Sequence, residues 1–189
     1  MSTGIRFTTA DLEALPDRLD DTRYELIDGE LLVAHQPHWE HQYVCLVLGA
    51  ALQKWSSETR LGQPNIAPGV IFSPEDDVAP DLVWISRERR ARALRDGKLY
   101  AAPELMVEVL SPGPTNERRD RVLKPKLYAR AEVEEYWLVD WRTRTVAVYR
   151  RAGESLVLVS TLTDGDDLTS PLLPGFAHPI ADLWGSPLD

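Results

Sequence analysis

The sequence contains one cysteine, Cys45, in 189 residues, so no disulfide can form within the chain, and a reducing compartment is expected. No apolar run approaches the ~20 residues that a membrane-spanning helix needs, and the amino terminus lacks the basic and apolar regions of a signal peptide. We therefore expect a soluble, cytoplasmic protein without a membrane partner. Cys45 lies within the apolar run Val44–Leu48, which indicates a small core side chain rather than a nucleophile.

Two common functional motifs are also absent. The sequence has neither a glycine-rich phosphate loop nor a G-x-S-x-G elbow, which excludes the commonest nucleotide-binding and serine-hydrolase classes. Basic residues are in the minority: the net charge is −9, which argues against non-specific binding to a polyanion. They are clustered at Arg87–Arg95 and Arg118–Arg130, so a local positive surface remains compatible with the composition.

The length and the 43% share of hydrophobic residues predict a single domain over residues 1–189, with its core at about residues 22–184. Thr8–Asp11 is typical of a capped helix start, and Pro16 is placed to end that short helix. Asp28-Gly29, between two alternating runs, predicts an antiparallel hairpin over Arg23–Ala34. A periodic apolar pattern predicts the longest helix from Pro37 to about Arg60, closed by Gly62.

The second half of the chain predicts further strands and two helices. Ser86 can cap a helix that ends at Asp96-Gly97, and a basic helix over Asn116–Ala131 should be disturbed at Pro125. The apolar stripe expected on the basic helix comprises Val122, Leu123, Leu127 and Tyr128. The expected strands are Asn65–Phe72 with a bulge or edge at Pro68-Gly69, Pro80–Ile85, Glu104–Leu110, Glu135–Asp140, Thr145–Tyr149 and Ser155–Leu162, followed by a docked irregular tail from Leu172 to Trp184. The order predicts an α/β fold with a mixed central β-sheet flanked by helices and an N-terminal β-hairpin.

Two acidic residues stand out on the predicted central strands. Glu108 lies in the apolar strand Glu104–Leu110, where an unpaired carboxylate would be costly to bury. Asp81 follows a proline at the entry of the strand Pro80–Ile85. Two carboxylates on neighbouring strands can hold one hard divalent cation, which orients a water and neutralises charge on a phosphate.

Longer motifs surround this pair. They are Pro103–Pro112, Asp120, Lys124, Leu127–Ala131 and Glu135–Asp140, together with Tyr24–Leu31, Glu40-His41 and Leu173–Phe176. Through these motifs the sequence closely resembles the bacterial Uma-two restriction-endonuclease family, within the PD-(D/E)XK superfamily. The resemblance covers roughly Tyr24 to Trp184. It implies a restriction-endonuclease-like fold with Asp81 and Glu108 as ligands of Mg²⁺ or Mn²⁺.

The resemblance also implies roles for three other residues. Leu110 stands where the superfamily lysine belongs, and Lys124 on the following helix would supply the migrated lysine. Pro125 follows Lys124 directly, so Lys126 is the substitute. His41 and Glu25 are expected as accessory members of the pocket.

Each residue also has a structural interpretation. Asp81 could cap a strand or turn, Glu108 could form a salt bridge, and Lys124 could be a solvated surface residue. His41 could be a structural histidine, and Glu25 a cross-strand charge. A zinc site at the pair His38 and His41, which flank Glu40, lacks a third ligand nearby, and the sequence does not fit the His-Glu-x-x-His motif. The basic helix could contact phosphates or present a solvated face.

The sequence therefore predicts a metal-dependent phosphodiesterase that cleaves nucleic acid, with DNA as the expected substrate. An inactive interaction protein that keeps the nuclease fold is the alternative, favoured by the acidity and by Leu110. Hydrolysis of nucleotides or small phosphate esters by the same pocket is a third interpretation. Exposed sheet edges and six tryptophans favour a homodimer.

Overall fold

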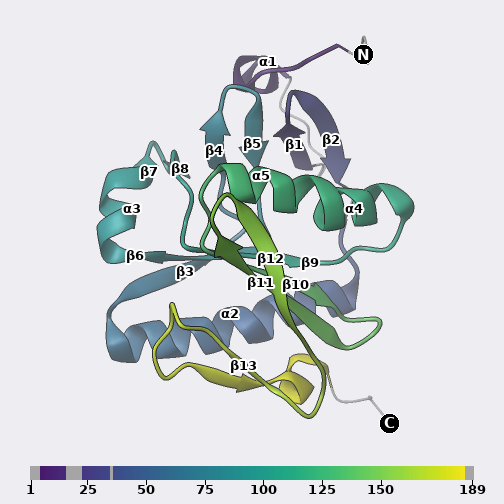
Figure 1. Ribbon diagram of the computed structural model, residues 1–189. Helices are drawn as coiled ribbons and strands as arrows, with labels where there is room; N and C mark the ends of the chain where they lie inside the picture. The colour runs from purple at the N-terminus through teal and green to yellow at the C-terminus, as the bar shows by residue number, and fades with distance from the viewer. Residues whose placement is uncertain (1–4, 16–22, 35, 186–189) are drawn as a thin grey trace.

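A six-stranded mixed sheet forms the centre of the molecule (Figure 1), in a computed structural model that describes residues 5–15, 23–34 and 36–185. The strand order is β12-β11-β10-β9-β6-β3. Only β9 and β10 are parallel among these neighbours; the other pairs are antiparallel. The strands are β3 (Gly62–Ile66), β6 (Leu82–Ser86), β9 (Leu105–Val109), β10 (Glu135–Asp140), β11 (Thr145–Ala152) and β12 (Ser155–Leu162).

A second sheet has the order β2-β1-β5-β4-β8-β7. Its first two strands are the predicted hairpin, in which Asp28 and Gly29 both have positive φ, of 52° and 70°. Two successive positive φ values are what the tight hairpin turn with the correct twist requires. The strands are β1 (Arg23–Ile27), β2 (Glu30–Ala34), β4 (Val70–Ser73), β5 (Asp76–Val78), β7 (Leu94–Arg95) and β8 (Lys98–Leu99).

Helices cover the two faces of the central sheet. The long helix α2 lies on one face and the α4–α5 segment on the other (Figure 1). No helix within the described ranges is long and apolar enough to cross a membrane. The helical elements are α1 (Thr9–Glu13), α2 (Trp39–Thr59), α3 (Arg87–Ala93), α4 (Pro114–Arg118), the π-helical turn η1 (Arg119–Leu123), α5 (Lys124–Arg130) and the 3₁₀ turn η2 (Ile180–Leu183).

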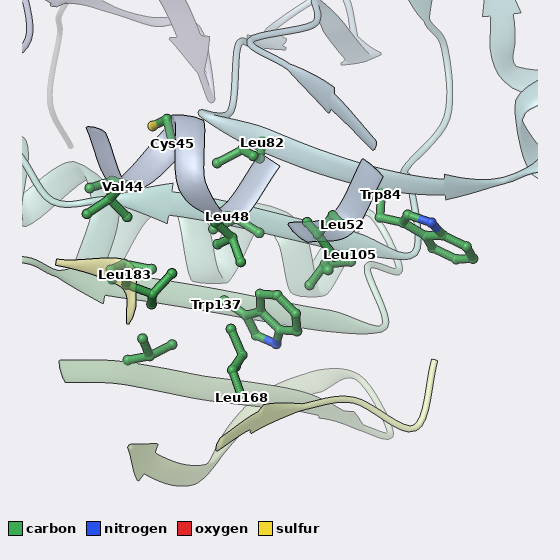
Figure 2. Packing of buried hydrophobic residues seen from close by; sticks show 14 of the residues in the cluster. Val44, Cys45, Leu48, Leu52, Leu82, Trp84, Leu105, Trp137, Leu168 and Leu183 are labelled. Carbon is green, nitrogen blue, oxygen red and sulfur yellow. The ribbon is translucent and has the colours of Figure 1, made fainter. Parts of the chain in front are cut away.

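Alternation along β9 divides the core into two clusters. Val107 and Val109 pack into the cluster that contains Leu48 and Trp137 (Figure 2), on the α2 face. Met106 and Leu110 belong to the second cluster, with Leu127 and Tyr128 of α5. The alternation predicted for this strand is confirmed, and Glu108 therefore faces the α5 side.

The C-terminal segment docks beyond α2. Its small sheet consists of β13 (Asp167–Thr169) and β14 (Ala177–Pro179). Phe176 stacks on Trp137 with ring centroids 6.1 Å apart, and the indole N–H of Trp55 donates to the Pro174 carbonyl at 3.1 Å. The tail is docked as predicted, but it is more regular than expected.

Two predicted boundaries are wrong. Asn65–Phe72 is not one strand, because β3 and β4 lie in different sheets and Ala67, with φ 48°, begins the break at Pro68-Gly69. Gly62 does not close α2; Arg60 does so in the left-handed conformation. Gly62 instead lets β3 approach β6 closely, since a Cβ there would lie 2.3 Å from the Ile85 carbonyl oxygen.

The structure also defines where the short helices α1 and α3 begin and end. Thr8 forms the predicted cap of α1, but Pro16 lies outside the described residues. Ser86 caps α3 as predicted. Asp96-Gly97 is the turn of the β7–β8 hairpin rather than the end of α3, because both residues have positive φ between two paired strands.

The basic helix is interrupted by a π-helical turn. Lys124 donates its backbone N–H to the Arg119 carbonyl, five residues back, directly before Pro125. A proline has no N–H and its ring clashes with the preceding turn, so a wider turn accommodates it. The five-residue step turns Arg119 and Lys124 to the same buried side, whereas Val122, expected in the apolar stripe, is 43% exposed.

We predict that Leu48→Ala lowers the free energy of unfolding by about 2–5 kcal/mol, because it opens a cavity between α2 and the central sheet. Leu46→Ala is the matched control on the same helix: Leu46 is 62% exposed and Leu48 fully buried, so it should change stability by less than about 0.5 kcal/mol. Urea denaturation followed by circular dichroism measures both. Equal losses would contradict the described face of α2.

Candidate active site

Asp81 and Glu108 meet across two central strands. β6 and β9 are antiparallel with Leu82 opposite Val107, so the register places the preceding Asp81 opposite Glu108. Side chains directly opposite each other on antiparallel strands share a face, with Cβ atoms roughly 4.5–5.5 Å apart. The backbone N–H of Val109 also donates to Asp81 Oδ2 at 2.8 Å, which ties Asp81 to β9.

Asp81 is held as a carboxylate. Besides Val109, its Oδ2 contacts His41 Nε2 at 3.1 Å, and its Oδ1 lies 3.8 Å from the Arg23 guanidinium. Burial acts to raise the pKa of Asp81, but the His41 hydrogen bond and the charges of His41 and Lys124 outweigh it and the net pKa is lowered. Asp81 is therefore ionised at neutral pH.

Glu108 is buried and accepts two hydrogen bonds at one oxygen. Its Oε1 accepts from Lys124 Nζ at 2.8 Å and from the Tyr128 hydroxyl at 2.6 Å. Burial raises the pKa of Glu108; the Lys124 ammonium opposes this, and the charges of Asp81 and other nearby carboxylates add to it. Its second oxygen, Oε2, accepts no hydrogen bond from the described residues, so it remains available to a ligand.

Lys124 is fully buried among three carboxylates. Its Nζ lies 2.8 Å from Glu108, 3.0 Å from Glu25 and 3.8 Å from Asp120. Burial acts to lower the pKa of Lys124, but the charges of these carboxylates outweigh it and the net pKa is raised. Lys124 thus stays an ammonium at neutral pH and acts as a fixed cation rather than as a proton acceptor.

Glu25 and Arg119 complete the buried network. Glu25 Oε1 accepts the backbone N–H of Ala79 at 2.9 Å in addition to Lys124, and its Oε2 lies 3.7 Å from Arg119 Nε. Arg119 also pairs with Asp120 through two hydrogen bonds of 2.6 and 3.0 Å. The hairpin, the central sheet and the π-helical turn are therefore joined by one ionic network.

A small pocket of about 100 Å³ opens onto this network. Three carboxylates, those of Glu25, Asp81 and Glu108, line the pocket together with the buried cations Lys124 and Arg119 and the partly exposed Arg23. The carboxylate oxygens of Asp81 and Glu108 suit a hard dication, and the pocket has room for a few waters. Oxygen ligands from one or two carboxylates, completed by water, are what Mg²⁺ prefers, so the residues present fit this ion.

The other side of the pocket is formed by the first two turns of α2. His41 and Cys45 are both buried there, with Sγ 3.7 Å from His41 Nδ1. Burial first, and then the charges of Asp81 and Glu108, raise the pKa of the Cys45 thiol well above its usual range. Cys45 is therefore a neutral thiol, consistent with its expected lack of nucleophilic character, although it lies at the pocket rather than only in the core.

Comparison with known proteins decides the family. The family model Uma2, described as "Putative restriction endonuclease", matches residues 9–182. The chain belongs to the Uma2 family. No curated protein matches it. Among solved structures, a crystal structure described as a putative nuclease belonging to DUF820, from Anabaena variabilis ATCC 29413, has a TM-score of 0.74 with 20% identity, covering 94% of this chain and 97% of that one.

The Uma2 assignment and this structural likeness bear out the predicted restriction-endonuclease-like fold. Within it, the five residues expected at the site, Glu25, His41, Asp81, Glu108 and Lys124, all line one pocket. Lys126 is exposed and takes no part in the described network. The side chain of Leu110 packs in the apolar cluster with Leu127, which leaves Lys124 as the cation beside Glu108.

Sequence reasoning missed several members of the site. Tyr128 was expected only as an apolar residue, and Arg119 only as part of the basic helix. The i, i+4 spacing of Asp120, Lys124 and Tyr128 was a usable signal, because residues four apart share a helix face. Nothing local marked Arg119, since its burial depends on the π-helical turn. Cys45 also gave no signal beyond its apolar surroundings.

We predict that Lys124→Met lowers the free energy of unfolding at pH 8 by about 3–5 kcal/mol, because the carboxylates of Glu108 and Glu25 lose their buried cation. The loss should shrink at pH 5.5. A carboxyl group whose pKa is raised in the folded state takes up its proton there as the pH falls, and this stabilises the fold. Lys126→Met, at an exposed position of the same helix, is the control, with an expected change below about 0.5 kcal/mol. Equal losses at both pH values in urea denaturation would contradict the network.

Proposed function

We propose that this Uma2 protein is a metal-dependent endonuclease that hydrolyses phosphodiester bonds of DNA through a PD-(D/E)XK-type site. One observation carries the proposal: Asp81 and Glu108 lie opposite each other on adjacent strands, at one pocket, with the Lys124 ammonium beside them. The family description, "Putative restriction endonuclease", supports the reaction class. Two carboxylates and a fixed cation are the groups that phosphodiester hydrolysis by a metal ion requires.

Asp81 and Glu108 are the proposed ligands of Mg²⁺ or Mn²⁺. Such an ion, when bound, supplies a water of lowered pKa and neutralises charge that develops on the phosphate. Asp81 is preorganised for this role, because the Val109 N–H and His41 fix its Oδ2 and leave Oδ1 directed towards the Arg23 side. Tyr128 fixes Glu108 in the same way through Oε1.

Lys124 is the proposed migrated lysine. Its ammonium is anchored by Glu25 and Glu108, so it can stabilise negative charge at the phosphate without moving far. His41 and Glu25 are positioning residues in this proposal, because each holds another member of the site by a hydrogen bond or ion pair. Residues that orient metal ligands in this way usually matter nearly as much as the ligands themselves.

Ion pairs engage the exposed arginines of the basic helix, whereas Lys126 is exposed and forms no ion pair with the described residues. Arg118, Arg121 and Arg130 on the α4–α5 segment are exposed, but each pairs with a carboxylate. These exposed ion pairs test neither of the two interpretations of the basic helix, a phosphate contact or a solvated face. Arg23 lines the pocket and its side chain is 41% exposed, so it is the proposed phosphate contact. With a net charge of −9, affinity for DNA should be weak and strongly salt-dependent.

We predict that Asp81→Asn and Glu108→Gln each reduce metal-dependent cleavage by at least about 100-fold, because each replaces a charged ligand by a neutral amide. Cleavage of single- and double-stranded DNA, and of RNA, with Mg²⁺ or Mn²⁺ measures this on a gel. Glu58→Gln, at an exposed position near the opposite end of α2, is the control and should retain parental activity. Cleavage that persists in both site variants would rule the proposal out, and cleavage of RNA alone would correct its substrate.

A non-catalytic scaffold is the second candidate. The observation that favours it is the 2.8 Å Lys124–Glu108 ion pair, which already satisfies one oxygen of the proposed ligand. A scaffold should bind no Mg²⁺ or Mn²⁺ in calorimetry. The proposed nuclease should bind one of these metals, and Asp81→Asn should abolish that binding. Calorimetry therefore separates the two candidates without any substrate.

A homodimer is proposed through the edge strand β12. Val157, Leu158 and Val159 are 42–54% exposed on this strand, which is the last in the described sheet. An apolar edge strand is a surface for pairing with a second chain. Light scattering should give twice the mass of 21.3 kDa for the parent and a lower mass for Leu158→Lys. Val122→Lys, also at a half-exposed apolar position, is the control; a monomeric parent would refute the dimer.

The single buried thiol agrees with the proposed cytoplasmic location.

A further inference from the structure

A second set of metal-ligand atoms lies on the α2 side of the same pocket. A ring nitrogen of His41, the Cys45 sulfur and an Asp81 carboxylate oxygen lie within 4.8 Å of one another. His41 and Cys45 are four residues apart on α2, so they share one helix face. In the proposed reaction Cys45 has no role, and His41 acts only through Asp81.

This donor set differs in kind from Asp81 and Glu108. A nitrogen, a sulfur and a single oxygen are the ligands of zinc and similar borderline metals, whereas Mg²⁺ takes oxygen alone. Three protein ligands with a fourth position open to water is an arrangement typical of solvent-accessible zinc sites. The pocket that both sets share supplies that open position.

We propose that His41, Cys45 and Asp81 form a binding site for Zn²⁺, and that occupancy of this site blocks the oxygen-ligand site by engaging Asp81. Zinc binding at these three residues does not depend on what the protein catalyses. Inhibition by zinc rests on the proposed nuclease function.

The geometry requires side-chain rotation to bring one nitrogen of His41, the Cys45 sulfur and an Asp81 oxygen onto the same ion. Ligand atoms around one tetrahedral zinc ion lie about 3.3 to 3.6 Å apart, from bond lengths of about 2.0–2.3 Å. Nε2 of His41 contacts Asp81 at 3.1 Å and Nδ1 contacts the Cys45 sulfur at 3.7 Å, so the ring lies between the two residues, and the three ligand atoms start within 4.8 Å of one another. Cys45 also lies at the margin of the labelled core residues, with its sulfur directed away from Leu48 (Figure 2).

Binding releases the proton of the Cys45 thiol and, where the His41 ring is charged, one ring proton as well. The Cys45 thiol binds zinc as the thiolate, so the S–H bond breaks, the sulfur–zinc bond forms and the proton passes to solvent. No oxidant or reductant takes part. Asp81 contributes a carboxylate that is already ionised, and its hydrogen bond from the Val109 N–H can persist.

The shared ligand explains the expected competition. Asp81 cannot serve both metals without placing two dications in a pocket of about 100 Å³ that holds buried Lys124 and Arg119 as well. Two-metal sites do hold dications roughly 3.5–4 Å apart, but here the buried charges of Lys124 and Arg119 add to the repulsion between the two metals. Zinc and magnesium should therefore exclude each other.

The test uses the full chain without an affinity tag and needs no nucleic acid for its first part. Co²⁺ serves as a spectroscopic probe, because a cobalt–thiolate bond gives a near-ultraviolet charge-transfer band. Zn²⁺ affinity is measured by competition with a chromophoric chelator. We expect one Co²⁺ per chain with this band in the parent, displaced by Zn²⁺.

Three variants make the result specific. Cys45→Ser should abolish the band and weaken Zn²⁺ binding at least tenfold, while Mg²⁺ or Mn²⁺ affinity changes less than twofold. His41→Asn should also weaken Zn²⁺ binding at least tenfold. His38→Ala, at the exposed histidine that precedes α2, is the control and should bind Zn²⁺ like the parent. Absence of the band in the parent, or unchanged Zn²⁺ affinity in Cys45→Ser, overturns the site; circular dichroism verifies that each variant is folded.

The second part measures inhibition. If the parent cleaves DNA, Zn²⁺ should inhibit it in the presence of Mg²⁺, a chelator selective for Zn²⁺ should restore cleavage, and Cys45→Ser should need at least tenfold more Zn²⁺ for the same inhibition. Equal inhibition of parent and Cys45→Ser overturns the blocking role. An inactive parent that still binds Co²⁺ through Cys45 contradicts the nuclease proposal and supports the zinc site.

Discussion

The buried ammonium of Lys124 is the contact on which both the fold and the site depend. Three carboxylates from β1, β9 and the π-helical turn converge on it, so segments separated by up to about a hundred residues are tied to a single charge. Burying one carboxylate in an apolar sheet is costly, and burying several without a cation would be far more so. The packing of α5 over β9 and the position of Glu108 are therefore set by the same ion pair.

The same network leaves carboxylate oxygens directed at the pocket. Arg119 pairs with Asp120, and Lys124 pairs with Glu25 and Glu108, whereas Asp81 accepts the Val109 N–H, contacts His41 and lies 3.8 Å from the partly exposed Arg23. A site organised in this way needs little rearrangement to receive a dication, which is the condition for efficient electrostatic catalysis. Asp81 belongs to both ligand sets, one with the oxygen of Glu108 and one with the nitrogen of His41 and the sulfur of Cys45. The identity of the bound metal would therefore decide whether the site supports cleavage or is blocked.

Local patterns predicted much of the fold. The Asp28-Gly29 hairpin, helix α2, the Ser86 cap and the alternation of β9 follow from neighbouring residues, and each is present. The prediction of one strand over Asn65–Phe72 is wrong because its two halves pair with partners in different sheets, and strand partners are not encoded in the run itself. The expected stripe of the basic helix is wrong at Val122 because a regular helical period was assumed across a π-helical turn.

The sequence by itself determined most of the longer elements, the family and the two acidic residues on central strands, since all three depend on short-range periodicity or on motif identity. Only the tertiary structure decided that Tyr128 supports Glu108, that Arg119 is buried, and that Cys45 lies beside His41 and Asp81. The reason is physical. These contacts depend on the β6–β9 register, on the packing of α2 and α5 against opposite faces, and on one widened helical turn, and each of these is settled by burial of the whole core rather than by neighbours along the chain.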